Sequence, residues 1–170
     1  MPPLTASEVG GNHPFSPEEL LYRRVGPQEF NSLGELLPTT IACVSFSAHV
    51  ESAPSVMRSD FSQPSDVLDP LCATKDVSGW VVYFVRVDNL PEDVKSGDGR
   101  PFHFFPKHQP EPMCGAHSVI ACCLATDPNR EYKKPSAGVA NAFKVQFVSR
   151  LKPITQVYDI ASRNALAVSA

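Results

Sequence analysis

The chain has 170 residues, of which 42% are apolar, 19% charged and 9% aromatic. This composition is typical of one folded domain and excludes the disordered class, in which low hydrophobicity accompanies high net charge. The formal net charge of −3 excludes a general electrostatic attraction of the whole surface to nucleic acid or anionic lipid. We therefore expect neither bulk DNA binding nor a membrane partner.

Proline and cysteine usage restrict the fold and the cellular compartment. The 17 prolines are about twice the usual share of roughly 5%, so we expect many loops and no long helices. The five cysteines are an odd number, and Cys122 adjoins Cys123 in an apolar stretch, which favours reduced thiols and predicts no structural disulfide. Residues 1–10 lack a leader pattern, and no run approaches the roughly 20 apolar residues of a membrane span, so we expect a cytoplasmic protein.

The composition of the N-terminal part of the chain predicts an arm followed by a short helix or turn. Residues 1–16 mix Pro, Gly, Ser and Asn without periodicity and are interpreted as an irregular arm. Ser16-Pro17-Glu18-Glu19 has the residue types of an N-cap, a first helical position and an acidic first turn. A short helix or turn should begin there. Residues 20–25 follow directly, and their pattern fits a continued helix or a strand.

Three segments have the composition of strands, and one has that of a short helix. Residues 79–87 are mostly β-branched or aromatic, which predicts a strand in the centre of a sheet. Residues 117–124 are an apolar run that ends at a turn signal, and residues 64–68 predict a short helix. Residues 39–50 are rich in β-branched side chains and alternate in polarity. The alternate positions expected to face the core are Ala42, Val44, Phe46 and Ala48.

Residues 137–151 form the main predicted helix. Apolar side chains recur there at three- and four-residue spacing, and Pro135 and Pro153 bound the segment. The predicted fold is therefore α+β, with a small, mostly antiparallel sheet of three to five strands, one main packed helix and many Pro-rich loops. Residues 17–152 should form the single domain, and residues 153–170 a C-terminal tail that docks or frays.

The densest cluster of reactive side chains lies near the predicted strand at residues 117–124. Its candidate metal ligands are His103, His108, Cys114 and His117, and Cys114 stands three positions before His117. No second Cys or His pair completes a zinc pattern, so we expect no metal site. A cysteine nucleophile with a histidine base is a second interpretation, using Cys43 or Cys114 with His49 or His117. Buried thiols and loop histidines are the ordinary alternative.

A further set of residues suits a phosphate-bearing ligand. Arginine donates two hydrogen bonds from a planar fork, and histidine exchanges a proton near neutral pH. The predicted ligand-binding residues are Arg23, Arg24, Ser55 and Arg58, with His117 as the catalytic acid or base. The alternative is a solvated arginine pair and a histidine that ends a strand. The sequence lacks a glycine-rich phosphate loop, dinucleotide glycines, a His-Glu-x2-His helix and a Gly-x-Ser-x-Gly elbow, so we expect no cofactor.

Four short blocks resemble small uncharacterised bacterial and phage proteins. These proteins carry an early Arg-Arg pair, a mid-chain Ser-Val-x-Arg element and a late Ala-His before a strand. The blocks in this chain are residues 21–25, residues 54–59 with 64–68, residues 79–82 and residues 115–120. The resemblance implies one compact domain of bacterial or phage type and implies no reaction.

Two functional hypotheses follow from these residues. The first is a protein that binds a phosphate-containing ligand, a nucleotide or RNA, with acid or base chemistry at His117. The alternative is a non-catalytic interaction factor of a bacterial or phage system, which binds another protein through Phe102, Phe104 and Phe105. For these three phenylalanines the competing interpretation is a loop that folds back over the core.

Overall fold

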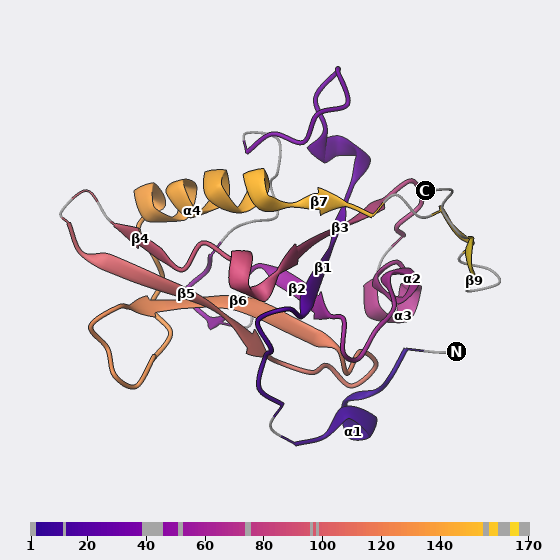
Figure 1. The fold of residues 1–170 in the computed structure, drawn as a ribbon, viewed down its shortest axis with the longest axis horizontal. Helices are drawn as coiled ribbons and strands as arrows, with labels where there is room; N and C mark the ends of the chain where they lie inside the picture. The colour runs from indigo at the N-terminus through magenta and orange to yellow at the C-terminus, as the bar shows by residue number, and fades with distance from the viewer. Residues whose placement is uncertain are drawn as a thin grey trace.

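The structure is a computed structural model that describes residues 3–11, 13–38, 46–50, 53–73, 76–95, 97 and 99–154, with the backbone of residues 157–159 and 164–166. In this part of the chain, seven strands form one antiparallel sheet with the order β4-β5-β6-β2-β1-β3-β7 (Figure 1). The strands are β1 (Leu20–Val25), β2 (Ser55–Arg58), β3 (Val81–Arg86), β4 (Asp93–Lys95), β5 (Pro101–His108), β6 (His117–Leu124) and β7 (Lys152–Pro153). A separate two-stranded sheet contains β8 (Val157–Asp159) and β9 (Asn164–Leu166).

One main helix of 14 residues and several short ones accompany the sheet. The α-helices are α1 (Ala6–Val9), α2 (Pro64–Val67), α3 (Pro70–Ala73) and α4 (Ala137–Arg150), and 3₁₀ turns cover Pro27–Glu29 and Val87–Asn89. The predicted α+β class is confirmed, as are the antiparallel pairing and the single main helix. The predicted count of three to five strands is too low. Prolines and charged side chains in β4, β5 and β7 obscure the strand pattern in the sequence.

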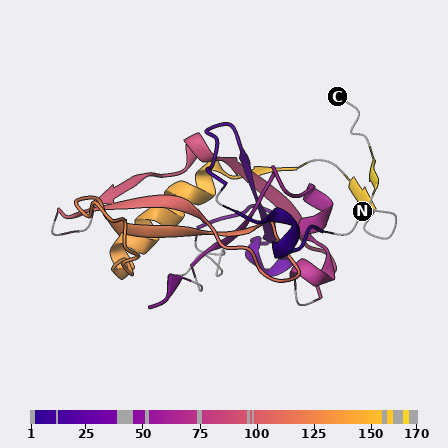
Figure 2. The same ribbon diagram turned by 90° about the horizontal axis from the view of Figure 1, so that it is seen from below.

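Helix α4 has the predicted position and covers one face of the sheet. The Ser136 hydroxyl oxygen accepts a hydrogen bond from the Val139 amide at 3.4 Å, which caps the first turn. Phe143 stacks on Phe104 of β5 at 4.2 Å between ring centroids and on Phe147 at 5.4 Å. Figure 2 shows α4 behind β5 and β6. These stacked rings fix the helix on the half of the sheet that β4, β5 and β6 form.

The predicted strands at residues 79–87 and 117–124 are confirmed by β3 and β6. Residues His117 to Cys123 of β6 are all buried, as expected for a strand that is covered on both faces. β3 lies one strand from the edge of the sheet, so its predicted central position is wrong. Residues 20–25, which fit a helix or a strand, form β1. The predicted short helix at residues 64–68 is confirmed by α2.

The N-terminal arm contains helix α1 and lies against the domain. The Gly115 amide donates to the Leu4 carbonyl at 2.6 Å, and a β-carbon at Gly115 would collide with the Thr5 carbonyl. Only glycine therefore fits between this arm and the loop before β6. The expected helix or turn after Ser16 is a turn, in which the Glu19 amide donates to the Ser16 carbonyl at 3.2 Å.

The segment predicted as a strand at residues 39–50 is only partly described. Residues 39–45, which include Ala42 and Val44, lie outside the described residues, and residues 46–50 contain no strand. Phe46 packs in the core at 5.5 Å from the ring of Phe104, as predicted. Ala48 is exposed, so its predicted core position is wrong. The sheet also extends beyond the predicted domain boundary, because Pro153 of β7 pairs with Tyr83.

A disulfide joins Cys72 of α3 to Cys114 in the loop before β6, with 5.1 Å between their α-carbons. The prediction of no structural disulfide is therefore wrong. The two cysteines are 42 positions apart in the sequence and meet only because α2 and α3 pack on the end of the sheet. This second apolar cluster contains Tyr22, Met57, Val67, Leu68, Cys72, Ala73, Val77, Val82, Cys114 and Ala116.

Candidate functional site

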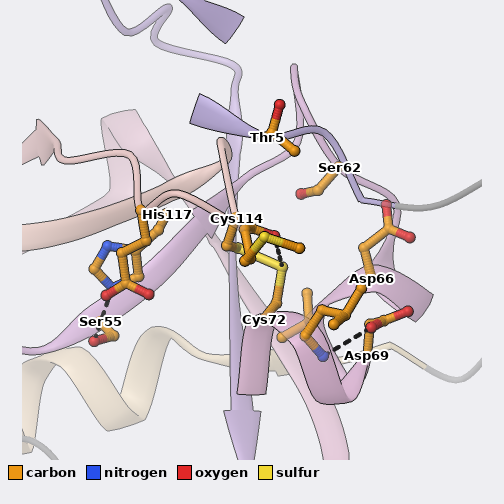
Figure 3. The surroundings of a disulfide bond; sticks show 12 residues. Thr5, Ser55, Ser62, Asp66, Asp69, Cys72, Cys114 and His117 are labelled. Atoms are coloured by element: carbon orange, nitrogen blue, oxygen red, sulfur yellow. Dashed lines mark hydrogen bonds and ion pairs between the residues drawn. A yellow bond between two sulfur atoms is a disulfide. The ribbon is translucent and has the colours of Figure 1, made fainter. Parts of the chain in front are cut away.

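Strands β1, β2 and β6 bring most of the predicted ligand-binding residues to one place. A cavity of about 20 Å³ between these strands and α3 is lined by Arg23, Arg24, Ser55 and His117, together with the disulfide cysteines. β2 lies between β1 and β6 in the sheet, so Arg23 and His117, which are 94 positions apart, line the same cavity. Figure 3 shows Ser55 and His117 together on one side of the disulfide.

Ser55 and His117 form a direct contact across two strands. Met57 pairs with His117 in the β2–β6 ladder, so Ser55 stands two positions away on the same face of the sheet. The Ser55 hydroxyl oxygen lies 3.2 Å from His117 Nε2, and His117 Nδ1 lies 2.8 Å from the Gln109 carbonyl oxygen. A carbonyl oxygen only accepts, so Nδ1 donates to it and, in the neutral ring, Nε2 accepts from the Ser55 hydroxyl.

A hydroxyl group and a carboxylate both lie beside His117 Nε2. The ring is 7% exposed, whereas Ser55 is exposed to solvent. The Glu111 carboxylate lies 3.6 Å from His117 Nε2. When the ring takes up a proton, its positive charge therefore lies beside a carboxylate and a carbonyl oxygen. The arrangement can accept a proton from the serine hydroxyl and return it.

The two arginines on β1 are held by backbone carbonyl groups. Arg23 Nη1 donates to the carbonyl oxygen of Ser55 at 3.0 Å. Arg24 Nη1 donates to the carbonyl oxygens of Val67 at 3.3 Å and Cys72 at 3.2 Å. Neighbouring strand residues point to opposite faces, so the two guanidinium groups reach different parts of the cavity wall. Both arginines therefore line the cavity while their guanidinium groups are bonded to the backbone.

Arg58, the remaining predicted ligand-binding residue, lies outside the cavity. Its guanidinium is fully buried and donates to both carboxylate oxygens of Glu19, at 2.7 and 2.8 Å. It also donates to the carbonyl oxygens of His13 at 2.7 Å and Pro14 at 3.0 Å, and lies 3.9 Å from the centre of the Phe15 ring. These contacts hold the Arg58 side chain against the N-terminal arm and away from the cavity. We therefore assign Arg58 the structural role of fixing the arm to the domain.

The candidate metal ligands are dispersed in the structure. His103 Nδ1 lies 3.1 Å from an Asp93 carboxylate oxygen, His108 Nδ1 lies 3.2 Å from the Ser118 hydroxyl, and Cys114 is in the disulfide. Among the described residues, no group of three or more His, Cys, Asp or Glu side chains is placed to hold a metal ion.

The interpretation of a cysteine nucleophile loses one of its two candidates. The sulfur of Cys114 is bonded to that of Cys72, so it cannot act as a thiolate nucleophile while the disulfide is intact. Cys43, the other candidate, lies outside the described residues, and His49 is exposed.

The three phenylalanines of the interaction hypothesis differ in their exposure. Phe102 is 5% and Phe104 1% exposed, because alternate residues of β5 face the core. Their interpretation as exposed contact residues is therefore wrong. Phe105 is half-buried and stacks on His103 at 5.8 Å between ring centroids. It is the one member of the set that faces away from the core.

Two larger hollows adjoin near the start of α4. Their volumes are about 550 and 490 Å³, and both are lined by Lys134, Pro135 and Ser136. Lys144 lines the first, whereas Arg100 and Lys133 line the second. Among the described residues, their walls are basic and carry no histidine, cysteine or carboxylate for acid or base chemistry.

Sequence reasoning missed Gln109, Glu111 and Cys72 as neighbours of the site. Gln109 acts through its backbone carbonyl, which no side-chain pattern reveals.

The sequence matches no protein-family model, and no curated protein or solved structure shows significant similarity to it. Of the helices in the described residues, none combines the length and apolarity needed to cross a bilayer.

Proposed function

We propose that this protein binds a phosphate-bearing ligand at the Ser55–His117 cavity and that His117 exchanges a proton with the bound ligand. The observation that carries the proposal is the convergence of Arg23, Ser55 and His117 from three adjacent strands on one cavity. A phosphate group offers several acceptor oxygens and negative charge. The cavity wall provides a hydroxyl group, an imidazole and two guanidinium groups that complement them.

The size of the cavity limits how the ligand binds. A volume of about 20 Å³ has room for about one water-sized group. A single phosphate oxygen fits that space, and the rest of the ligand would lie outside, beside the exposed hydroxyl group of Ser55. A ligand bound in this way contacts the protein mainly through its phosphate.

The ligand class is a nucleotide or another small phosphate ester in preference to a long nucleic acid. The cavity has room for one phosphate oxygen, and the net charge of −3 disfavours a general attraction of the whole surface to nucleic acid. RNA would present the same phosphate chemistry but would neutralise several lysines or arginines, so its affinity would fall steeply with salt. The salt dependence of binding therefore separates the two ligands.

Calorimetric titration with inorganic phosphate, adenosine monophosphate and a short RNA tests the proposal. Ser55→Ala and His117→Gln should each weaken binding of adenosine monophosphate at least fivefold, because each removes a polar contact to the phosphate. Lys134→Ala is the matched control, since it removes a positive charge from the larger hollows. Loss of binding in Lys134→Ala with unchanged binding in the other two variants would overturn the proposal.

A further inference from the structure

We infer that Ser55 is a nucleophile, that His117 is its general base, and that the protein transfers the phosphoryl group of a phosphate ester to Ser55 and then to water. This inference rests on the proposed function, because it uses the same phosphate site. Nucleophilic catalysis by serine needs a hydroxyl within hydrogen-bond reach of a base, and a third group that orients the base. Ser55, His117 Nε2 and the Gln109 carbonyl oxygen provide these three parts at 3.2 and 2.8 Å.

Exposure distinguishes this serine–histidine contact from a structural one. A second such contact joins the Ser118 hydroxyl to His108 Nδ1, also at 3.2 Å. Ser118 is fully buried, so no substrate reaches its oxygen, whereas Ser55 is exposed above a buried base. The two contacts have the same chemistry and length, and only Ser55 is open to an incoming phosphorus atom.

Charge around Ser55 favours attack on a phosphate. Arg23 Nη1 is bonded to the backbone carbonyl oxygen of Ser55, which fixes the strand that carries the nucleophile. The strand register places Arg24, which also lines the cavity, on the same face of the sheet as Ser55. Donors that are already in position stabilise the charge on the phosphoryl oxygens during transfer. Glu111 lies next to His117 Nε2 and stabilises the imidazolium that forms when the serine proton arrives.

The reaction balances with a phosphate ester and water as the only reactants. The Ser55 oxygen bonds to phosphorus as the bond from phosphorus to the leaving oxygen breaks. The hydroxyl proton moves to His117 Nε2 and then to the leaving oxygen, which departs as an alcohol. Water next attacks the phosphoserine while His117 takes its proton. The Ser55 oxygen then leaves phosphorus, regains that proton and releases inorganic phosphate.

A fluorophosphate reagent tests the nucleophile directly. Incubation of the full chain with diisopropyl fluorophosphate should add one diisopropylphosphoryl group to Ser55 with loss of fluoride, as measured by intact mass and peptide mapping. Ser55→Ala should give no adduct, and His117→Gln should slow labelling about 100-fold or more, the usual effect of losing a general base. Ser118→Ala is the matched control and should label at the wild-type rate.

The outcomes separate this inference from the proposed function. Wild-type binding of adenosine monophosphate without labelling of Ser55 would overturn the inference and leave the binding proposal intact. Labelling of Ser55 without binding of phosphate or nucleotide would overturn the binding proposal. Ser55→Thr provides a second variant that keeps a hydroxyl group, and labelling at that position should persist at a lower rate. Equal labelling in the wild type and in His117→Gln would exclude His117 as the base.

Discussion

Reduction of the disulfide between Cys72 and Cys114 should lower the free energy of unfolding by about 4 kcal/mol. The bond closes a loop of 42 positions. The chain-entropy relation for a loop of this length gives about 13 cal/mol/K, which is about 4 kcal/mol at 25 °C. A domain of this size has roughly 5–15 kcal/mol of stability in total, so the loss would be a large part of it.

Urea unfolding followed by the fluorescence of Trp80 measures this effect. Trp80 is the single tryptophan and packs against the cluster that contains the disulfide. With a urea slope of about 2 kcal/mol/M, a phosphine reductant should lower the midpoint by about 2 M. The double variant Cys72→Ala/Cys114→Ala should be insensitive to the reductant. A shift below about 0.5 M in the wild type, or an equal shift in the double variant, would refute the reasoning.

Three further predictions concern buried groups. Arg58→Met leaves the enclosed carboxylate of Glu19 without its partner, so the free energy of unfolding should fall by about 3–5 kcal/mol. In urea unfolding, Arg58→Met/Glu19→Gln should recover part of this loss, and a double variant no more stable than the single one would contradict the prediction. Burial raises the pKa of Cys122 from 9.0 to about 12, which leaves about a thousandfold fewer thiolates. Iodoacetamide should therefore label Cys122 far more slowly in the folded chain than in urea, as measured by peptide mass spectrometry, and similar rates would contradict this. Desolvation and the nearby cation of Arg58 lower the pKa of His108 from its ordinary 6.5. The fold favours the neutral ring, so this stability is fully present above pH 6.5 and is lost as the pH falls towards the lowered pKa. His108→Gln should flatten the decline of the urea midpoint between pH 7 and 5, and unchanged slopes would count against the prediction.

The sequence predicted those helices and strands whose residue pattern is visible within the element itself. The apolar run of β6 and the helical spacing of α4 contain their own signals, and both elements occur where they were expected. β5 was missed because Pro106 and the histidines interrupt its alternation, although its backbone pairs with β6 along its whole length except Pro101. Phe102 and Phe104 are buried because of this pairing.

Contacts between distant residues explain the remaining differences. Sequence reasoning chose Arg58 as a ligand-binding residue by its type, but its partner Glu19 is 39 positions away and occupies the guanidinium. Cys72 and Cys114 have no local signal for pairing. Ser55 and His117 were selected by type as well, and the strand order β6-β2-β1 then placed them in contact. The same strand order thus brings Ser55 and His117 into contact but leaves Arg58 outside the cavity.

Nuclear magnetic resonance of the His117 imidazole during titration with adenosine monophosphate tests the phosphate site most directly. In the free protein the ring nitrogens should show a protonated Nδ1, bonded to the Gln109 carbonyl, and an unprotonated Nε2. Adenosine monophosphate should shift the Nε2 resonance saturably, and Ser55→Ala should reduce that shift. A stationary His117 signal, with shifts confined to the amides around Lys134, would contradict the proposed site.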